Sequence, residues 1–259
     1  MKLLLKIAYL GTHYHGYQVQ PNAPSVQGKL NEAAKAVFGY DCDIVGCSRT
    51  DSGVHANEFC ATVARRKTEE LDTRVPVERI PLALSAHLPE DICVFDASWV
   101  SSDFHARYDV KEKEYLYRIY NAPVRNPFEE GRSCHYPKRI DDAALNSMQL
   151  AASKLCGTHD FSSYMAQGSK VTSTVRTVKR SEVERDGNMI LYRVAADGFL
   201  YNMVRILTGT LIEVAEGKIS PDEIEEITEA RDRSRAGMTM PACGLYLNRV
   251  LYPESLLKL

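Results

Sequence analysis

The sequence predicts an α+β protein made of two tandem βαββαβ halves, whose sheets join into one antiparallel platform with helices on one side. Three observations predict this class. Short stretches rich in β-forming residues alternate with amphipathic helical stretches. The order strand, helix, strand, strand, helix, strand occurs twice. The 259 residues, 44% hydrophobic and 25% charged, suit a globular chain of one large or two ordinary domains.

The N-terminal half, residues 1–103, contains six predicted elements. A strand turns at Gly11, and Ser25 caps a helix with one apolar face. Two short β-rich strands follow, and then a helix with Pro76 near its first turn and Pro89 just past its end. A fourth strand ends the half. The strands span residues 2–10, 43–47, 58–64 and 92–100, and the helices span residues 26–38 and 75–87.

The C-terminal half, residues 104–259, repeats this order after a joint near residues 101–109. Its first strand alternates cleanly, as a half-buried strand does. Asp141 caps a helix that Gly157 ends, Asp186-Gly187 marks a hairpin, and a long amphipathic helix stops at Gly217. The strands span residues 114–120, 175–184, 189–195 and 244–252, and the helices span residues 141–155 and 199–215, with a short one from residue 221. Each half thus has the order of a ferredoxin-like unit.

Charge and cysteine content exclude several classes of protein. With 32 Lys+Arg against 34 Asp+Glu, the net charge of −2 excludes a uniformly basic protein, but not a nucleic-acid partner, which needs only a local patch. No apolar run approaches the length of a membrane span, and Lys6 breaks the apolar run that begins at Leu3, so no signal peptide is predicted. The 7 scattered cysteines predict reduced thiols and no zinc site. We expect a cytoplasmic protein.

The most unusual stretch is SRTDSGVHA at residues 48–56, a polar segment between two apolar strands. A turn accounts for its Asp and Gly. A pocket wall is the alternative, because Arg49 and Asp51 are two residues apart and share a face of an extended segment. A nearby cation keeps a carboxylate ionised, and such a carboxylate can act as a nucleophile or a general base.

This stretch resembles the [GS]RTDxGVHA signature of the TruA-type tRNA pseudouridine synthases. Further stretches resemble other elements of that family in the same order. They are YLGTHYHGYQVQ at residues 9–20, FHARY at 104–108 with KEYLY at 113–117, FLYNMVR at 199–205, and GLYL at 244–247 with Tyr252-Pro253. Tyr17 stands where the family usually has Trp, and Thr172 where bacterial members usually have a basic residue.

The resemblance implies isomerisation of uridine to pseudouridine in tRNA, without a cofactor or a metal. Asp51 matches the family's essential aspartate, which attacks C1′, attacks the base or abstracts a ribose proton. Tyr115 would stack on the flipped uracil, Arg49 would contact the RNA, Arg205 would pair with Asp51, and Leu245 would form an apolar wall. Taken singly, each residue is equally explained by core packing or a solvated surface.

The resemblance also implies two tRNA-contacting loops and a homodimer that binds the anticodon stem-loop and modifies nucleotides 38 to 40. The first loop consists of Phe104, His105, Ala106, Arg107 and Tyr108. The second consists of Gly168, Ser169, Lys170, Val171 and Thr172. With few cations near the site in an acidic chain, we expect a bipolar surface and tRNA affinity that falls steeply with salt.

Two other functions compete with this one. A non-catalytic RNA-binding protein with tandem RRM-like sheets would carry an aromatic RNP motif, and the sequence has none. A retaining glycosidase would need a second carboxylate about 5 Å from the first. Glu58 and Asp109 are the candidates for it, and nothing in the sequence supports either.

Overall fold

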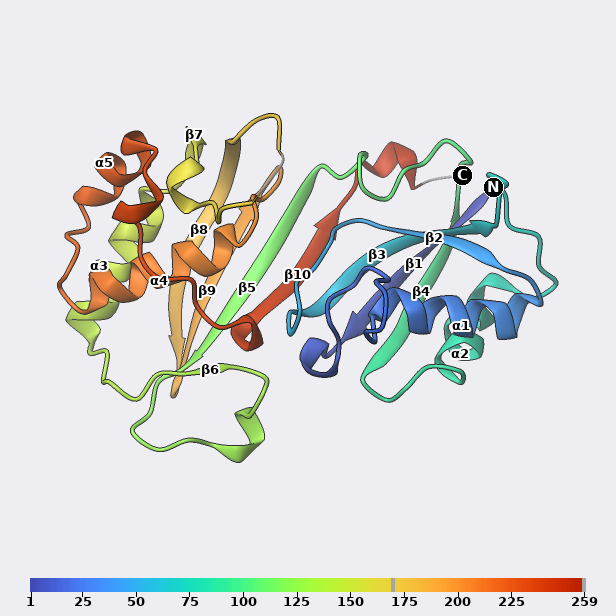
Figure 1. Cartoon of the computed structure of the whole chain (residues 1–259), viewed down its shortest axis with the longest axis horizontal. Helices are drawn as coiled ribbons and strands as arrows, with labels where there is room; N and C mark the ends of the chain where they lie inside the picture. The colour runs from blue at the N-terminus through green and yellow to red at the C-terminus, as the bar shows by residue number, and fades with distance from the viewer. Residues whose placement is uncertain (169–170, 258–259) are drawn as a thin grey trace. The chain divides into compact units, whose positions relative to one another are not determined.

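The computed structural model describes residues 1–168 and 171–257, and its contacts divide the chain into two compact units (Figure 1). Unit 1 comprises Met1–Lys111 and Tyr246–Leu259, and unit 2 comprises Glu112–Leu245. The chain passes from unit 1 to unit 2 after Lys111, close to the division predicted between residues 103 and 104. It returns to unit 1 at Tyr246, and the prediction contains no such return.

Unit 1 contains a mostly antiparallel sheet with two helices. Its strand order is β4-β1-β3-β10, with β2 also on β3. All of these pairs are antiparallel except β3 with β10, which is parallel. In Figure 1 both helices lie together against one face of this sheet. The elements are β1 (Lys2–Tyr9), α1 (Val26–Phe38), β2 (Cys42–Gly46), β3 (His55–Arg65), α2 (Ile80–Ser85), β4 (Ile92–Val100) and β10 (Leu245–Leu251).

Local sequence accounts for most of unit 1. Ser25 accepts a hydrogen bond from the Gly28 N–H at 3.2 Å and caps α1 as expected. The helix expected over residues 75–87 was too long, because only Ile80–Ser85 is α-helical and a 3-10 turn precedes it. The physical reason is Pro81, which lacks an N–H and whose ring would clash with the carbonyl of an earlier α-helical turn.

Unit 2 has its own mostly antiparallel sheet, with strand order β5-β9-β8-β7, and β6 parallel to β5. Figure 1 shows α3 and α4 together beside this sheet. The elements are β5 (Glu112–Tyr120), β6 (Cys134–His135), α3 (Asp142–Ser153), β7 (Gly157–Asp160), β8 (Val175–Asp186), β9 (Met189–Ala196), α4 (Met203–Ala215) and α5 (Glu223–Ala230). Both units are therefore mixed α/β structures.

Three expectations for unit 2 need correction. The helix expected from residue 199 begins at Met203, because Asn202 before it adopts the left-handed conformation with φ of 58°. The residues between β8 and β9 are Gly187 and Asn188, one position later than expected. The short strands β6 and β7 were not expected, since neither has an apolar alternation. No helix within the described ranges is long and apolar enough to cross a membrane.

Candidate active site

Asp51 lies in a tight turn between β2 and β3. Val54 donates its backbone N–H to the Asp51 carbonyl oxygen at 3.1 Å, and this bond closes a four-residue turn from Asp51 to Val54. Gly53, the third of these, has a φ of +77°, where an L side chain is crowded. The Asp51 side chain is half-buried and Arg49 is exposed. The segment is thus a turn that carries a half-buried carboxylate. A turn and a pocket wall, the two interpretations of its sequence, are therefore compatible.

The chain between β1 and α1 holds this turn in place. The Tyr17 N–H donates to the Thr50 carbonyl oxygen at 3.1 Å. The Tyr14 carbonyl oxygen accepts from the Gly53 N–H and from the Ser52 hydroxyl, each at 3.3 Å. The two stretches at residues 9–20 and 48–56 therefore form one local structure within unit 1.

Two glycines allow these backbones to approach so closely. Gly16 has a φ of +92°, and a Cβ there would lie 2.5 Å from the Thr50 carbonyl oxygen. A Cβ on Gly11 would collide with the Val54 carbonyl oxygen. The Gly11 N–H also donates to Nδ1 of His55, a fully buried side chain at the start of β3, at 2.9 Å. Sequence reasoning quoted these glycines only as part of a motif, and their spacing was the available signal for this contact.

Thr50, between Arg49 and Asp51, is buried and hydrogen-bonded. Thr50 is 7% exposed, and its Oγ1 lies 2.8 Å from the hydroxyl of the buried Tyr9. Arg49 is exposed and Asp51 is half-buried, so both residues are more accessible than Thr50 between them. That Arg49 and Asp51 share one face, as their spacing predicts, stays a prediction.

Tyr115 belongs to unit 2, where it lies near the start of β5 and pairs with Val194 of β9. Its side chain is 7% exposed. The Phe199 ring meets it edge-on, with ring centroids 4.9 Å apart and planes at 82°. An edge-to-face contact fixes the plane of the tyrosine ring. Tyr115 is therefore an oriented ring on a regular strand.

Arg205 of α4 is half-buried and held at two atoms. Its Nε donates to the Met240 carbonyl oxygen at 2.6 Å, and its Nη1 donates to Oδ1 of Asn202 at 2.8 Å. These bonds fix the guanidinium plane, as its fork of donors permits. Arg205 and Asp51 belong to different units, and their pairing stays a prediction.

Leu245 follows residues 241–244, which contact Tyr117 of β5. The Tyr117 hydroxyl donates to the Pro241 carbonyl oxygen at 2.7 Å, and a Cβ on Gly244 would lie 2.6 Å from the Tyr117 ring. Burial raises the pKa of Tyr117 far above its usual range, so this hydroxyl stays protonated and donates. Leu245 itself is 6% exposed. Tyr117 thus supports residues 241–244, which precede Leu245.

The first loop predicted to contact tRNA divides into buried and exposed side chains. Phe104 and Ala106 are buried, and the Ala106 carbonyl oxygen accepts from the hydroxyl of Tyr252 at 2.6 Å. Arg107 and Tyr108 are exposed, with the guanidinium carbon 5.8 Å from the ring centroid. The latter pair offers a cation and an aromatic face to solvent.

Inside the same loop, Nδ1 of His105 accepts from the N–H groups of Arg107 and Tyr108 at 3.1 and 3.3 Å. The His105 ring also lies against the Tyr108 ring, with centroids 4.3 Å apart.

In the second loop, Gly168, Val171 and Thr172 are exposed. Ser169 and Lys170 lie outside the described residues.

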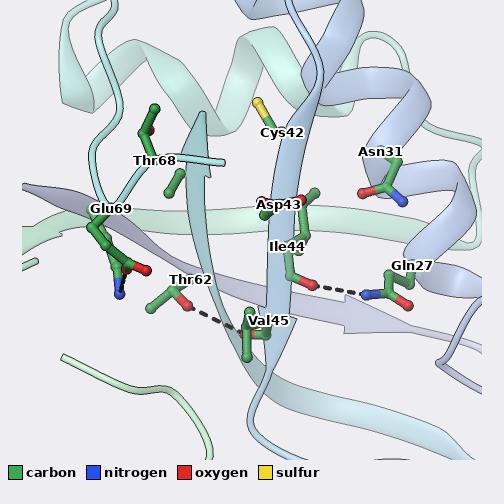
Figure 2. A pocket seen from close by; sticks show the side chains of 11 residues that line it. Gln27, Asn31, Cys42, Asp43, Ile44, Val45, Thr62, Thr68 and Glu69 are labelled. Atoms are coloured by element: carbon green, nitrogen blue, oxygen red, sulfur yellow. Dashed lines mark hydrogen bonds and ion pairs between the residues drawn. The ribbon is translucent and has the colours of Figure 1, made fainter. Parts of the chain in front are cut away.

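A cavity of about 400 Å³ lies in unit 1 between α1, β2 and β3, and no predicted site residue lines it. Figure 2 shows Gln27 of α1 reaching β2, where its Nε2 donates to the Ile44 carbonyl oxygen at 2.8 Å. This bond occupies an edge of β2 that would otherwise be exposed. In the described part of the chain, no group of three or more His, Cys, Asp or Glu side chains could hold a metal ion, and no two cysteines form a disulfide.

Comparison with known proteins shows the family. The family model described as tRNA pseudouridine synthase matches residues 6–109 and 151–253. Proteins called "tRNA pseudouridine synthase A" from Thermoanaerobacter sp. (strain X514) and Acetivibrio thermocellus are 44% and 45% identical over 252 and 248 residues. Each match covers 96% of this chain and 99% or 98% of the relative.

The protein of that name from Bacillus pumilus is 42% identical over 256 residues, which are 97% of this chain and 99% of the relative. Among solved structures, a Cbf5-Nop10-Gar1 complex matches at 13% identity with a TM-score of 0.36, covering 95% of this chain and 58% of that chain. The family model and the near full-length relatives establish that the chain belongs to the tRNA pseudouridine synthase family.

Proposed function

We propose that this protein isomerises uridine to pseudouridine in tRNA, with Asp51 as the catalytic carboxylate. The observation that supports this most strongly is the turn that begins at Asp51, which lies inside the family match. The turn and Thr50 before it are held by hydrogen bonds to Tyr14 and Tyr17. Such a support keeps a reacting group in place, and rigid placement accounts for a large share of enzymatic rate.

The reaction is an internal rearrangement. The bond between uracil N1 and ribose C1′ breaks, the base rotates, and a bond forms between C5 and C1′. The proton on C5 leaves and N1 gains one, so atoms and electrons balance without an oxidant or a reductant. Asp51 either attacks C1′ or the base, or removes a ribose proton. Each role needs an ionised and oriented carboxylate.

The remaining site residues act on the substrate. We propose that Tyr115 stacks on the extruded uracil, which base–aromatic stacks favour by about 1–3 kcal/mol. Leu245 forms the apolar wall of the base pocket, and Arg205 pairs with Asp51 and keeps it ionised. Arg49 is exposed and contacts the RNA. Extruding a nucleotide costs a few kcal/mol in such enzymes, so these contacts offset that cost.

The exposed loop residues bind the rest of the tRNA. Arg107 and Tyr108 are available to phosphate and base, whereas the buried Phe104 and Ala106 hold their loop in shape. The loop at residues 168–172 contacts the same RNA.

We further propose that each chain consists of two tandem ferredoxin-like halves and that two chains form a homodimer. This homodimer works in the cytoplasm on nucleotides 38 to 40 of the anticodon stem-loop. The helices of each unit, packed beside its sheet, support the ferredoxin-like assignment.

The test is an isomerisation assay on tRNA transcripts that carry uridine at nucleotide 38, 39 or 40, with each pseudouridine mapped. The wild-type protein should convert these uridines. Asp51→Asn and Asp51→Ala should abolish conversion and retain tRNA binding, because they remove only the charge or the carboxyl group. Asp96→Asn, at an exposed carboxylate on β4, is the control and should convert normally. Binding without conversion by the wild type would make the protein a non-catalytic RNA binder.

A further inference from the structure

We propose that Tyr9 and Thr50 form a positioning pair that sets the direction of the Asp51 carboxylate. The inference rests on the proposed function, in which Asp51 is the reacting group. It assigns a role to two residues that do not touch the substrate. They act through the backbone that carries Asp51.

The pair is a buried hydroxyl–hydroxyl hydrogen bond. The Tyr9 hydroxyl and Thr50 Oγ1 lie 2.8 Å apart, and the two residues are 4% and 7% exposed. Either hydroxyl can donate to the other. A buried hydroxyl that loses its partner retains the cost of its desolvation, so each residue holds the other in place.

Tyr9 is a rigid anchor because it ends a strand inside the sheet. It pairs with Ala56 of β3, and its ring lies 5.8 Å from that of the fully buried Phe59. The pairing shifts from Ile7 with Phe59 to Tyr9 with Ala56, so β3 bulges just after the Asp51 turn. Bulges of this kind redirect a strand and are frequent beside active sites.

Thr50 transmits this anchor to Asp51. Its carbonyl oxygen is held by the Tyr17 N–H at 3.1 Å, while its side chain is held by Tyr9. The side chain of a β-branched residue has few χ1 choices, so fixing Oγ1 also fixes the backbone to which it is attached. The peptide unit between Thr50 and Asp51 is therefore held from two directions, and the carboxylate keeps one orientation.

The test compares substitutions that differ by one hydroxyl. Thr50→Val keeps the shape and removes the hydroxyl, Thr50→Ser keeps the hydroxyl, and Tyr9→Phe removes the partner. We expect Thr50→Val and Tyr9→Phe to lower kcat for pseudouridine formation about 10- to 100-fold, because small misplacements of a reacting group have effects of this order. KM should change less than about twofold and Thr50→Ser should retain most of kcat, since substrate contacts and the hydroxyl remain.

The double variant Tyr9→Phe/Thr50→Val should be no slower than the slower single variant, because the same hydrogen bond is lost once. Tyr40→Phe is the matched control. It removes a hydroxyl that donates to the Asp72 carbonyl oxygen elsewhere in unit 1, and kcat should not change. All rates are measured well below the unfolding transition of each variant, followed by circular dichroism.

Normal kcat in Thr50→Val or Tyr9→Phe would overturn the inference. So would equal losses in Thr50→Val and Thr50→Ser, or a loss confined to KM. Failure of the proposed function has a different signature, because the wild-type protein would then form no pseudouridine under any condition.

Discussion

Arg205 and Met240 are joined by two hydrogen bonds, one in each direction. The Arg205 Nε donates to the Met240 carbonyl oxygen at 2.6 Å, and the Met240 N–H donates to the Arg205 carbonyl oxygen at 3.2 Å. Nearby, a Cβ on Gly209 of α4 would collide with the Met238 carbonyl oxygen. Residues 237–240 thus lie directly on α4, and Arg205 has a structural role in unit 2 whatever it contacts in the substrate.

Arg205→Lys should therefore destabilise the fold. Lysine cannot reproduce the two bonds to Met240 and Asn202, because its ammonium lacks the planar fork of the guanidinium. We expect a loss of about 1.5–3 kcal/mol in the free energy of unfolding, measured by urea denaturation. Arg180→Lys, at an exposed arginine paired with Glu114 and Glu182, should cost less than about 1 kcal/mol. Equal losses would contradict a structural role for Arg205.

Gly16→Ala should damage the turn that carries Asp51. The new methyl group would lie 2.5 Å from the Thr50 carbonyl oxygen, and alanine is strained at a φ of +92°. Neither backbone can retreat without breaking the bond from Tyr17 to Thr50. We expect a loss of more than about 3 kcal/mol in unfolding free energy, from strain and collision together, and a clear fall in kcat.

Gly39→Ala separates the cost of backbone strain from the cost of steric collision. Gly39 ends α1 with a φ of +79°, and nothing lies within 4 Å of the place its Cβ would take. It should cost only the left-handed backbone strain, about 1–2 kcal/mol, with kcat unchanged. If Gly16→Ala cost no more than Gly39→Ala, the close approach to Thr50 would have no energetic weight.

Tyr17→Phe should stabilise the protein. The Tyr17 ring stacks on Phe59 with centroids 4.2 Å apart, and among the described residues its buried hydroxyl has no hydrogen-bond partner. Removing that hydroxyl keeps the stack and relieves a desolvation cost, so unfolding free energy should rise by about 1 kcal/mol. Tyr192→Phe should lower it by a similar amount, because that hydroxyl bonds to Ser181 at 3.1 Å. Thermal unfolding of both variants shows whether each substitution raises or lowers the unfolding free energy.

Local patterns predicted most strands and helices because caps and alternation act over a few residues. Ser25, Asp141 and Gly217 mark helix ends in the structure as they did in the sequence. The start of α4 was set too early because residues 199–201 continue its apolar pattern, while Asn202 breaks the backbone geometry. Hydrophobic periodicity carries no signal for a single left-handed residue.

The candidate site depended on contacts between distant segments, which a single sequence does not reveal. The Tyr9–Thr50 bond joins residues 41 positions apart, and the Tyr117–Pro241 bond joins residues 124 positions apart. Family motifs identified the stretches but not which of their residues support the others. The burial of Phe104 and Ala106 was likewise hidden, because aromatic and small residues suit both a core and an RNA surface.

Acid should weaken the end of α4 through Glu216. Hydrogen bonds from Lys218, Tyr136 and Lys138 lower the pKa of this carboxyl from its usual 4.5 to about 2. A carboxyl with a depressed pKa in the folded state stabilises the fold above its unfolded pKa. That contribution is lost as the pH falls from about 4.5 through about 2. Both lysines are exposed, so screening keeps the contribution to about 1–2 kcal/mol.

The measurement is unfolding free energy across that pH range for the wild type and Glu216→Gln. The variant should be less stable at neutral pH and should lose less stability on acidification. Glu229→Gln, on the exposed side of α5, should follow the wild-type curve. Parallel curves for the wild type and Glu216→Gln would show that the carboxylate contributes nothing to the acid response.

Arg107 and Tyr108 should affect tRNA binding in different ways, although they are neighbours on one exposed loop. A cation on a phosphate releases counterions, so Arg107→Gln should reduce the slope of log affinity against log salt by about 1. An aromatic ring stacks on bases without displacing ions, so Tyr108→Ala should lower affinity by a similar factor at every salt concentration. Arg79→Gln, an exposed arginine elsewhere in unit 1, should change neither quantity. An unchanged slope in Arg107→Gln would mean that Arg107 contacts no phosphate, and a changed slope in Tyr108→Ala would mean that this ring acts by holding the guanidinium rather than by stacking.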